Sequence, residues 1–365
     1  MTSQEELQKD GYILVAPLDW GLGHAVRCVP LIRQLLADGQ QVLLGGSEHS
    51  LHFLRKHYPW LPAVELPAYR VRYPFKWMWF NMLWQSGRLL RTAWREHLFL
   101  RKLQQHYPLR AVISDNRFGL FTTCLPSVYI THQCTFPLRS PFLRWVANGG
   151  HRAVMQRFTE VWVPDYPPPR QLAPQLSSLP PSLPAYHIGV LTDQQPPVLG
   201  GEKPYRAVIV LSGPEPQRTR LEELLVAQLP QISGRFVLVR GTLYGRPLPV
   251  IEGVSVLQIA GRARLQSLAA KTDLIIARSG YTTIMDLSAS GHKALLIPTP
   301  GQPEQEYLAR ELHRHGYGHA VAQGQLHLAA DLARAEATTG FPLHQHRSGA
   351  LLRERLMDWY TTISD

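Results

Sequence analysis

The chain has 365 residues, with 38 Lys or Arg against 27 Asp or Glu, so its formal net charge is +11. Apolar residues make up 45% of the chain and charged residues 18%, a balance that fills hydrophobic cores and excludes a disordered protein. At roughly 100–200 residues per domain, the length predicts two domains. The positive charge favours an anionic partner, namely a phosphorylated substrate, a membrane surface or a nucleic acid.

The number of cysteines and the hydropathy of the chain indicate the cellular compartment in which the protein folds. Three cysteines cannot build a disulfide framework, and an odd number indicates a reducing environment. Residues 1–10 have no apolar signal core, and no stretch reaches the ~18 apolar residues of a transmembrane helix. We therefore expect a cytoplasmic protein without a membrane span.

The first half of the chain alternates short apolar runs with helical patterns. Residues 12–16 predict a strand, and residues 25–37 have the apolar spacing of a helix that ends near Gly39. Further strands are predicted over residues 41–44, 111–114, 127–131 and 160–163. Strands separated by helices favour a parallel sheet with crossover connections. We predict a Rossmann-like domain over residues 1–165.

The alternation restarts after a proline-rich stretch. Residues 164–204 contain 11 of the 30 prolines, and because proline cannot donate to a sheet we interpret residues 166–204 as a linker. Strands are then predicted over residues 207–211, 236–239, 255–258, 274–277 and 294–297. We predict a second Rossmann-like domain over residues 205–345, and a C-terminal helix within residues 346–365 that is placed to cross back onto the first domain.

The predicted fold class is therefore α/β, with two doubly wound domains that face each other across a cleft. In open α/β sheets, ligands bind outside the carboxyl ends of the strands, where helices begin. This geometry favours a nucleotide-type ligand.

The first motif, Gly21-Leu22-Gly23-His24, joins the first predicted strand to a helix. The two glycines let the backbone approach a ligand, but Val26 stands where a dinucleotide fingerprint has its third glycine. His24 at a helix N-terminus has its protonated form disfavoured, which suits a neutral base or a hydrogen-bond donor. The alternative is an ordinary turn with a structural histidine.

The second motif, residues 278–286, also joins a strand to a helix. Gly280 permits close approach of a ligand, neighbouring hydroxyls and helix N–H groups suit a diphosphate, and Arg278 supplies charge. Asp286 lies two turns into the helix, where a carboxylate can hold a ribose diol. The alternative is a helix capped by Ser279. The candidate donor-binding residues of this motif are Arg278, Ser279, Gly280, Thr282, Thr283 and Asp286.

Two further loops follow strands of the second half. Gln302 and Gln305 offer amide groups to sugar hydroxyls, although a plain proline-rich turn explains the same residues. Gly213 lies in a strand–glycine–helix loop and is a weaker phosphate candidate.

Taken in this order, the motifs resemble the two-domain (GT-B fold) glycosyltransferases, most closely family 28, the group of the lipid-II-forming peptidoglycan N-acetylglucosaminyltransferase. The resemblance is strongest over residues 273–320. Asp286 stands where the family has a ribose-binding Glu, Gln305 matches one of its sugar-contacting glutamines, and Glu304 and Leu308 depart from its pattern. The resemblance implies an inverting, metal-independent hexosyltransferase that moves a sugar from a UDP-linked donor to a hydroxyl of a lipid-linked or cell-envelope acceptor.

The front of the chain carries a second resemblance. Gly21-Leu22-Gly23-His24 is similar to the family's Gly-rich loop with its functional His, but residues 21–28 also resemble the GxGHxxRC opening of a nucleotide-sugar hydrolase from nonulosonic acid synthesis. A hydrolase, or a non-catalytic nucleotide-sugar-binding protein, therefore stays open as an alternative. The resemblance implies His24 as base or phosphate-facing donor, with Asp115 or Asp19 as the alternative base or orienting carboxylate. The implied acceptor-side residues are Gly21, Gly23, Asn116, His132 and Gln133.

Residues 69–107 contain eight Lys or Arg, one acid and four tryptophans. Aromatic and cationic side chains on one helix face fit the boundary between lipid headgroups and acyl chains, where each cation adds ~1 kcal/mol on an anionic leaflet. The face is formed by Trp77, Phe80, Trp84, Arg88 and Arg91. We expect peripheral contact with the inner face of the plasma membrane, which favours a transferase over a hydrolase. The alternative is that the tryptophans are buried and the arginines solvated.

Other ligand classes fit less well. The chain has no Asp-x-Asp and no Cys-x-x-Cys, so no metal site and no cofactor beyond the nucleotide sugar is expected. A nucleic-acid partner leaves the phosphate-type loops of the second half unexplained.

Overall fold

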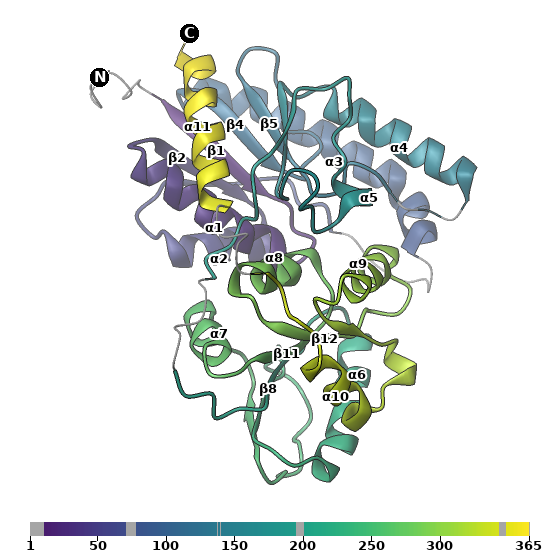
Figure 1. Ribbon diagram of the computed structural model, residues 1–365. Coiled ribbons are helices and arrows are strands. Elements are labelled where there is room, and N and C mark those ends of the chain that lie inside the picture. The colour runs from purple at the N-terminus through teal and green to yellow at the C-terminus, as the bar shows by residue number, and fades with distance from the viewer. Residues whose placement is uncertain are drawn as a thin grey trace. The chain divides into compact units, whose positions relative to one another are not determined.

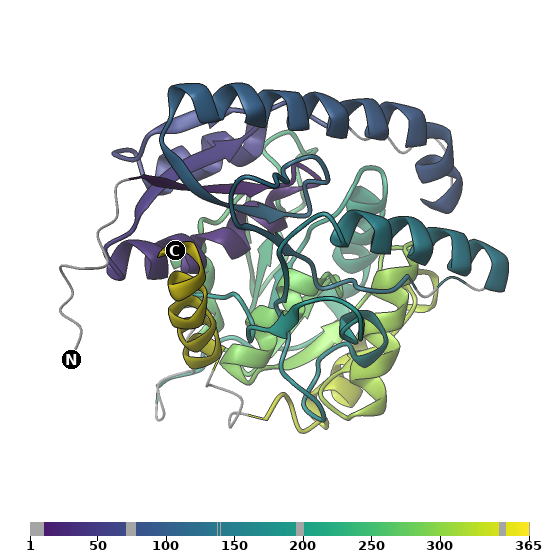
Figure 2. The same ribbon diagram turned by 90° about the horizontal axis from the view of Figure 1, so that it is seen from above.

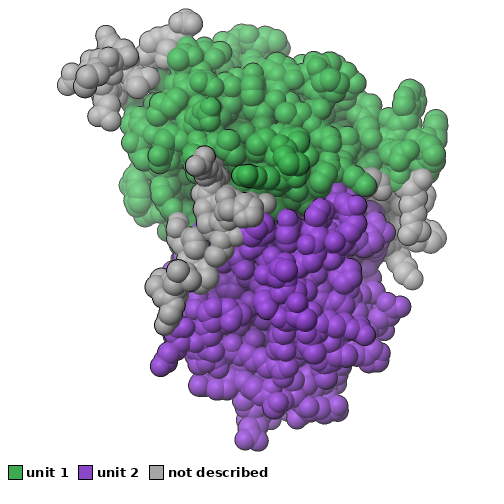
Figure 3. Space-filling model, in the orientation of Figure 1, with its two compact units in different colours: residues 1–193, 347–365 green, residues 194–346 purple. Residues whose placement is uncertain are grey.

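The computed structural model describes residues 11–70, 78–136, 138, 140–194, 201–342 and 348–364, with side chains in the helix at 78–106 described from residue 84 onward. The chain forms two compact units, residues 1–193 with 347–365 and residues 194–346, drawn in green and purple in Figure 3. Each unit is a parallel α/β sheet covered by helices, which confirms the predicted α/β class with two doubly wound domains (Figure 1).

The first unit contains a seven-stranded sheet in the order β3-β2-β1-β4-β5-β6-β7, with every neighbouring pair parallel. Its strands are β1 (Tyr12–Pro17), β2 (Gln41–Gly46), β3 (Ala63–Glu65), β4 (Leu109–Asp115), β5 (Ser127–Ile130), β6 (Glu160–Val163) and β7 (Ala185–His187). Its helices are α1 (Leu22–Ala37), α2 (Glu48–His57), α3 (Met78–His106), α4 (Pro141–Met155), α5 (Pro174–Ser177) and α11 (Ser348–Ser364).

The strand order reverses between β1 and β4, where Pro17 pairs with Asp115 at the carboxyl ends. Doubly wound sheets bind ligands at this point of reversal, because the two crossover connections leave on opposite faces and open a crevice there. The residues that follow β1 and β4 are therefore the first place to look for a site.

The core of this unit follows the two-residue period of β1. Ile13 and Val15 pack with α1, α2 and α11 on one face of the sheet, and Leu14 and Ala16 pack with α3 on the other (Figure 2). The strand is apolar throughout because both of its faces are covered.

Helix α11 packs on the first unit although it follows the second in sequence. The Trp359 ring meets Trp162 edge to face at 5.3 Å between centroids. The Tyr360 hydroxyl donates to Asp38 at 2.9 Å, and Arg355 donates to Glu160 at 3.1 Å. The C-terminal helix thus completes the core around α1.

The proline-rich stretch differs from the prediction, because residues 166–193 belong to the first unit and contain α5 and β7. The buried carboxylate of Asp165 accepts the backbone N–H groups of Tyr166, Leu172 and Ala173 at 2.8–3.2 Å. These bonds hold the turns that proline alone cannot stabilise, so the interpretation of residues 166–193 as a linker is wrong. Residues 195–200 lie outside the described residues.

The second unit contains a six-stranded parallel sheet in the order β10-β9-β8-β11-β12-β13, which reverses between β8 and β11. Its strands are β8 (Ala207–Val210), β9 (Phe236–Val239), β10 (Val254–Leu257), β11 (Leu274–Ala277), β12 (Lys293–Leu296) and β13 (His319–Ala320). Its helices are α6 (Gln217–Gln228), α7 (Arg262–Ala269), α8 (Tyr281–Ser290), α9 (Pro303–Arg314) and α10 (Leu328–Glu336), with 3₁₀ turns at Leu229–Gln231 and Gln323–Gln325. Among the described residues, no helix is long and apolar enough to span a bilayer.

Candidate active site

Polar side chains gather at the reversal point of the first sheet. His24 lies in the first turn of α1, Asp115 ends β4, and His132 follows β5. All three contact the guanidinium of Arg27, one turn further along α1. The structure therefore brings three predicted site residues together around Arg27, which the sequence analysis did not propose as a site residue.

Arg27 and Asp115 form a buried bidentate pair. Arg27 Nε donates to Asp115 Oδ2 at 2.7 Å, and Nη2 donates to Oδ1. Burial acts to raise the pKa of Asp115, but Arg27 and His24 outweigh it and hold that pKa well below its usual range. The carboxylate is ionised, buried and engaged through both oxygens, which suits an orienting role and not that of the base.

His24 is the partly exposed member of this cluster, with 15% of its side chain exposed, whereas the other three residues are buried. Its Nδ1 lies 3.1 Å from Asp115 Oδ1 and 2.9 Å from Arg27 Nη2. Burial, followed by the Arg27 charge, lowers the pKa of His24 despite the opposing effect of Asp115. Among the described residues no hydrogen bond involves Nε2, so a neutral imidazole presents this nitrogen to a ligand.

The predicted acceptor-side residues share this edge of the sheet. His132 Nδ1 lies 3.1 Å from Arg27 Nη1. Gly21 caps α1 with φ +96°, and a Cβ atom added there meets nothing within 4 Å, so the helix N-terminus faces open space. Asn116 has φ +58°, and its backbone N–H donates to Ile130 O at 3.1 Å. Gly23 opens α1, and Gln133 follows β5 with its backbone N–H bonded to Thr131.

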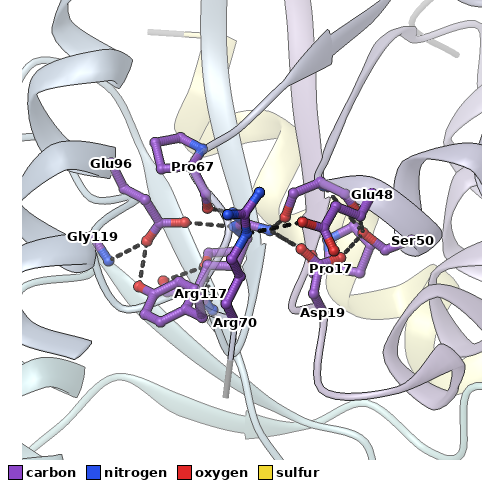
Figure 4. Close-up of polar contacts among 12 residues, drawn as sticks. Pro17, Asp19, Glu48, Ser50, Pro67, Arg70, Glu96, Arg117 and Gly119 are labelled. Atoms are coloured by element: carbon purple, nitrogen blue, oxygen red, sulfur yellow. Dashed lines mark hydrogen bonds and ion pairs between the residues drawn. The ribbon is translucent and has the colours of Figure 1, made fainter. Parts of the chain in front are cut away.

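A second buried cluster lies beside the first and is centred on Arg117 (Figure 4). Arg117 Nε donates to Glu96 Oε1 at 2.6 Å, and Nη1 and Nη2 donate to the carbonyls of Pro17 and Pro67. Glu96 also accepts from the Gly119 backbone N–H and from a tyrosine hydroxyl. The sequence analysis missed this pair, although Glu96 is the single acid among the cations of residues 69–107.

Asp19 lies on the solvent side of this second cluster. Its Oδ1 accepts from the Ser50 hydroxyl, and its Oδ2 is 3.8 Å from Arg117 Nη1 with no hydrogen-bond partner among the described residues. Burial raises the pKa of Asp19, against the opposing effects of Ser50 and Arg117. A carboxylate with a raised pKa and an unoccupied oxygen suits a general base.

The second unit brings three predicted loops together at its own reversal point. A Cβ atom on Gly213, after β8, would lie 3.5 Å from Thr299 Oγ1 and 4.0 Å from Arg278 Nε. The Ser279 hydroxyl, after β11, donates to the Gln305 carbonyl at 2.7 Å. The loops after β8, β11 and β12 thus form one surface.

Arg278 has a different role from the predicted one. Its guanidinium is buried and donates to the carbonyls of Ile297, Pro298 and Gln217 and to the Gln323 side chain, at 2.7–3.2 Å. Burial lowers the pKa of Arg278 to about 10. Arg278 fastens the loops to one another and has no solvent-facing surface with which to meet a diphosphate.

Other predicted donor-binding side chains are also partly engaged. Gln305 accepts the Thr299 backbone N–H at 2.9 Å and donates to Gln302 Oε1 at 2.6 Å. Asp286 pairs with Arg262 of α7 at 3.0 Å, so a ribose there would share the carboxylate with a guanidinium.

The N-terminus of α8 is the part of this surface best suited to a diphosphate. Gly280, not Ser279, is the N-cap residue, no side chain caps the helix, and a Cβ on Gly280 would meet nothing within 4 Å. Thr282 and Thr283 lie half-buried in the first turn. The positive end of the helix dipole therefore faces open space, as an anion site requires.

The predicted membrane face is partly described. Trp84 is 59% exposed and Arg88 and Arg91 are exposed, whereas Trp77 and the Phe80 side chain lie outside the described residues. Helix α4 adds an exposed aromatic pair that the sequence analysis missed, Phe142 and Trp145, with ring centroids 6.4 Å apart. Their spacing of three residues on an amphipathic helix was the available signal.

Metal ligands are scarce in the part of the chain that the structure describes. No group of three or more His, Cys, Asp or Glu side chains there could hold a metal ion. The metal-independent reaction stays a prediction.

Comparison with known proteins supports the assignment of fold and class. Residues 256–339 match the glycosyltransferase family 28 C-terminal domain. An uncharacterised glycosyltransferase of Methanosarcina mazei is 23% identical over 330 residues, covering 83% of each chain. The UDP-N-acetylglucosamine–N-acetylmuramyl-(pentapeptide) pyrophosphoryl-undecaprenol N-acetylglucosamine transferase of Sorangium cellulosum is 38% identical over 94 residues, which are 22% of this chain and 23% of that protein.

Solved structures share the fold over nearly the whole chain. The kitacinnamycin glycosyltransferase aligns with a TM-score of 0.69 and 15% identity, covering 98% of this chain and all of that one. MurG of Acinetobacter baumannii aligns with a TM-score of 0.59 and 14% identity, covering 97% and 100%. The two-domain glycosyltransferase fold and the enzyme class predicted from the motifs are confirmed.

Proposed function

We propose that this glycosyltransferase, whose second unit carries a family 28 C-terminal domain, moves a sugar from a UDP-linked donor to a hydroxyl group of a lipid-linked acceptor. The single observation that carries the proposal is the family match over residues 256–339, which contains the uncapped N-terminus of α8. The partial relatives are named for a UDP-sugar donor and an undecaprenol-linked acceptor, which supports the same substrate classes here.

The second unit would hold the donor. The diphosphate would bind at Gly280, where the dipole of α8 stabilises the charge that develops on the leaving group. Asp286 would bind the ribose, and Gln302 would contact the sugar. No metal and no further cofactor enters this reaction, because the helix dipole supplies the positive potential.

The first unit would bind the acceptor and handle its proton. The acceptor oxygen attacks the anomeric carbon, the bond from that carbon to the diphosphate breaks with its electron pair leaving on the diphosphate, and the configuration inverts. The hydroxyl proton passes to a protein group. His24 and Asp19 lie at this sheet edge with 15% and 12% of their side chains exposed, and they are the two candidates to receive it.

Membrane contact would come from the exposed aromatic and cationic side chains of α3 and α4. Trp84, Arg88 and Arg91 on α3 and Trp145 on α4 have the amphipathic character of interfacial helices. With a net charge of +11, the protein would be drawn to an anionic leaflet, where a lipid-linked acceptor is held.

A nucleotide-sugar hydrolase is the second candidate. It is favoured by Arg27 and Cys28, which complete the GxGHxxRC pattern and both contact Asp115. In that reaction water replaces the acceptor hydroxyl.

Release of UDP from a panel of UDP sugars tests the proposal. We expect release from at least one sugar to rise severalfold when membrane extract supplies the acceptor. Equal release with and without extract would support the hydrolase, and binding without release would reject both enzymes.

A further inference from the structure

The Nδ1 atom of His24 has two neighbours that make opposite demands on it. Asp115 Oδ1, at 3.1 Å, is an acceptor and calls for a proton on Nδ1. Arg27 Nη2, at 2.9 Å, can only donate and calls for the Nδ1 lone pair. Nδ1 cannot carry a proton and present a lone pair at the same time, so only one of the two contacts can be a hydrogen bond, and that contact sets the tautomer of the ring.

Counting donors and acceptors decides between the tautomers. Arg27 already supplies Asp115 with two hydrogen bonds, from Nε and Nη2, and the Cys28 thiol lies 3.7 Å from Oδ2. The carboxylate therefore keeps its partners without His24. If Nδ1 carried a proton, however, a buried N–H of Arg27 would point at another N–H with 2.9 Å between the two nitrogens, which is repulsive.

The second imidazole of the cluster faces the same guanidinium. His132 Nδ1 lies 3.1 Å from Arg27 Nη1, so Arg27 meets a ring nitrogen on each of its terminal amino groups. Protonation of His24 would place a cation against the guanidinium in a buried site, and burial, followed by the Arg27 charge, lowers the pKa of His24. The groups that face His24 are thus Arg27, Asp115 and His132, and together they favour a neutral ring with its proton on Nε2.

A His24 ring with its proton on Nε2 has no exposed nitrogen that can accept a proton, and Asp19 provides an atom that can. Its Oδ2 is a buried carboxylate oxygen with no hydrogen-bond partner among the described residues. Ser50 holds Oδ1, and Arg117 and Glu48 are the charged groups that face the carboxylate. The oxygen is held in place and free to receive a proton.

We infer that Arg27 is a positioning residue that fixes neutral His24 with its proton on Nε2, so that His24 donates a hydrogen bond to an oxygen of the substrate and Asp19 receives the acceptor's proton. The inference rests on the proposed function for its substrate. The bond changes are those of the transfer: the acceptor O–H bond breaks, its proton binds Asp19 Oδ2, and the electron pair of that bond enters the new bond to the anomeric carbon.

Nitrogen-15 NMR of the full chain reads the tautomer without any substrate. Two-bond correlations show which ring nitrogen carries the proton, and the His24→Gln spectrum identifies the signal of His24. We expect the proton on Nε2 in the parent and a shift of the population toward Nδ1–H in Arg27→Lys, since a lysine ammonium cannot reach both rings and Asp115. A proton on Nδ1 in the parent, or an unchanged tautomer in folded Arg27→Lys, would overturn the role of Arg27. If Arg27→Lys does not fold, the double variant Arg27→Met with Asp115→Asn removes both charges together.

Turnover separates a donor from a base at position 24. Release of UDP from UDP-N-acetylglucosamine is measured with membrane extract. His24→Gln keeps an N–H near the position of Nε2 but cannot take a proton, so we expect it within about tenfold of the parent and ~10–100-fold above His24→Ala. Asp19→Asn keeps the acceptor for Ser50 and should lose ~10²–10⁴-fold.

The outcomes are distinguishable. Equal loss in His24→Gln and His24→Ala, together with near-native turnover in Asp19→Asn, would make His24 the base and reject the inference. A parent that turns over no UDP sugar rejects the proposed function and the role of Asp19 as base, whereas the NMR result for Arg27 and His24 stands by itself.

Discussion

The buried pair of Glu96 and Arg117 gives a sharp prediction about stability. Glu96→Gln preserves the shape of the side chain but leaves the Arg117 cation, which is fully buried, without its 2.6 Å counter-charge. Removing one partner of a buried pair costs ~3–5 kcal/mol, and Asp19 at 3.8 Å from Arg117 moves the expectation toward the lower end. This is a large fraction of the ~5–15 kcal/mol that stabilises a typical domain.

A matched control is present in the same view. Arg70 and Glu48 form an exposed pair at 3.0 Å, and both are labelled beside the buried pair in Figure 4. Glu48→Gln should cost at most ~1 kcal/mol, because water screens the exposed charges. Urea unfolding followed by tryptophan fluorescence measures both variants. Similar small losses in the two would refute the reasoning that burial makes the Glu96 pair indispensable.

Four further predictions concern packing, acid stability, ligand binding and membrane binding. Trp359→Ala should lower the free energy of unfolding by ~3–5 kcal/mol, since the ring is fully buried against the first sheet; a loss below 1 kcal/mol by denaturant titration would contradict this packing. The folded-state pKa of Asp115 is depressed, so its contribution to stability is present above the ordinary aspartate pKa of about 3.9 and is lost as the pH falls toward the folded value; Asp115→Asn should flatten the acid limb of a plot of melting temperature against pH. Asp286→Ala should weaken UDP binding severalfold in calorimetry while leaving the melting temperature near that of the parent, and unchanged affinity would remove Asp286 from the ribose site. Trp145→Ser should reduce flotation with anionic vesicles, whereas Trp60→Ser, at an equally exposed tryptophan elsewhere, should not; equal behaviour would remove α4 from the membrane face.

Local sequence patterns predicted most of the secondary structure correctly. The apolar runs at residues 41–44 and 274–277 are strands in the structure, and the helix predicted over residues 25–37 is α1, which begins three residues earlier. These elements could be predicted because a two-residue or 3.6-residue apolar period arises from the chain's own geometry and needs no distant partner. The C-terminal helix was predicted on the same grounds.

The roles of individual side chains depended on contacts that no local pattern contains. Arg27 and Asp115 lie 88 residues apart and meet because β4 pairs directly with β1. Arg278 stands in a phosphate-type loop by sequence, yet its side chain turns inward and donates to the carbonyls of Ile297, after β12, and of Gln217, at the start of α6. A loop motif shows which residue types are present at a site. The direction of each side chain depends on its tertiary contacts, which the motif does not contain.

The residue pattern alone was enough to predict the class of this protein. Two strand–glycine–helix motifs predicted helix N-termini suited to anions in two α/β domains, and the resemblance to the family pattern over residues 273–320 implied a glycosyltransferase. The chemistry within the site depends on contacts between distant residues that form when the chain folds. The order of strands in each sheet sets which charges share a buried space, and that sharing lowers the pKa values of His24 and Asp115, whereas burial raises that of Asp19.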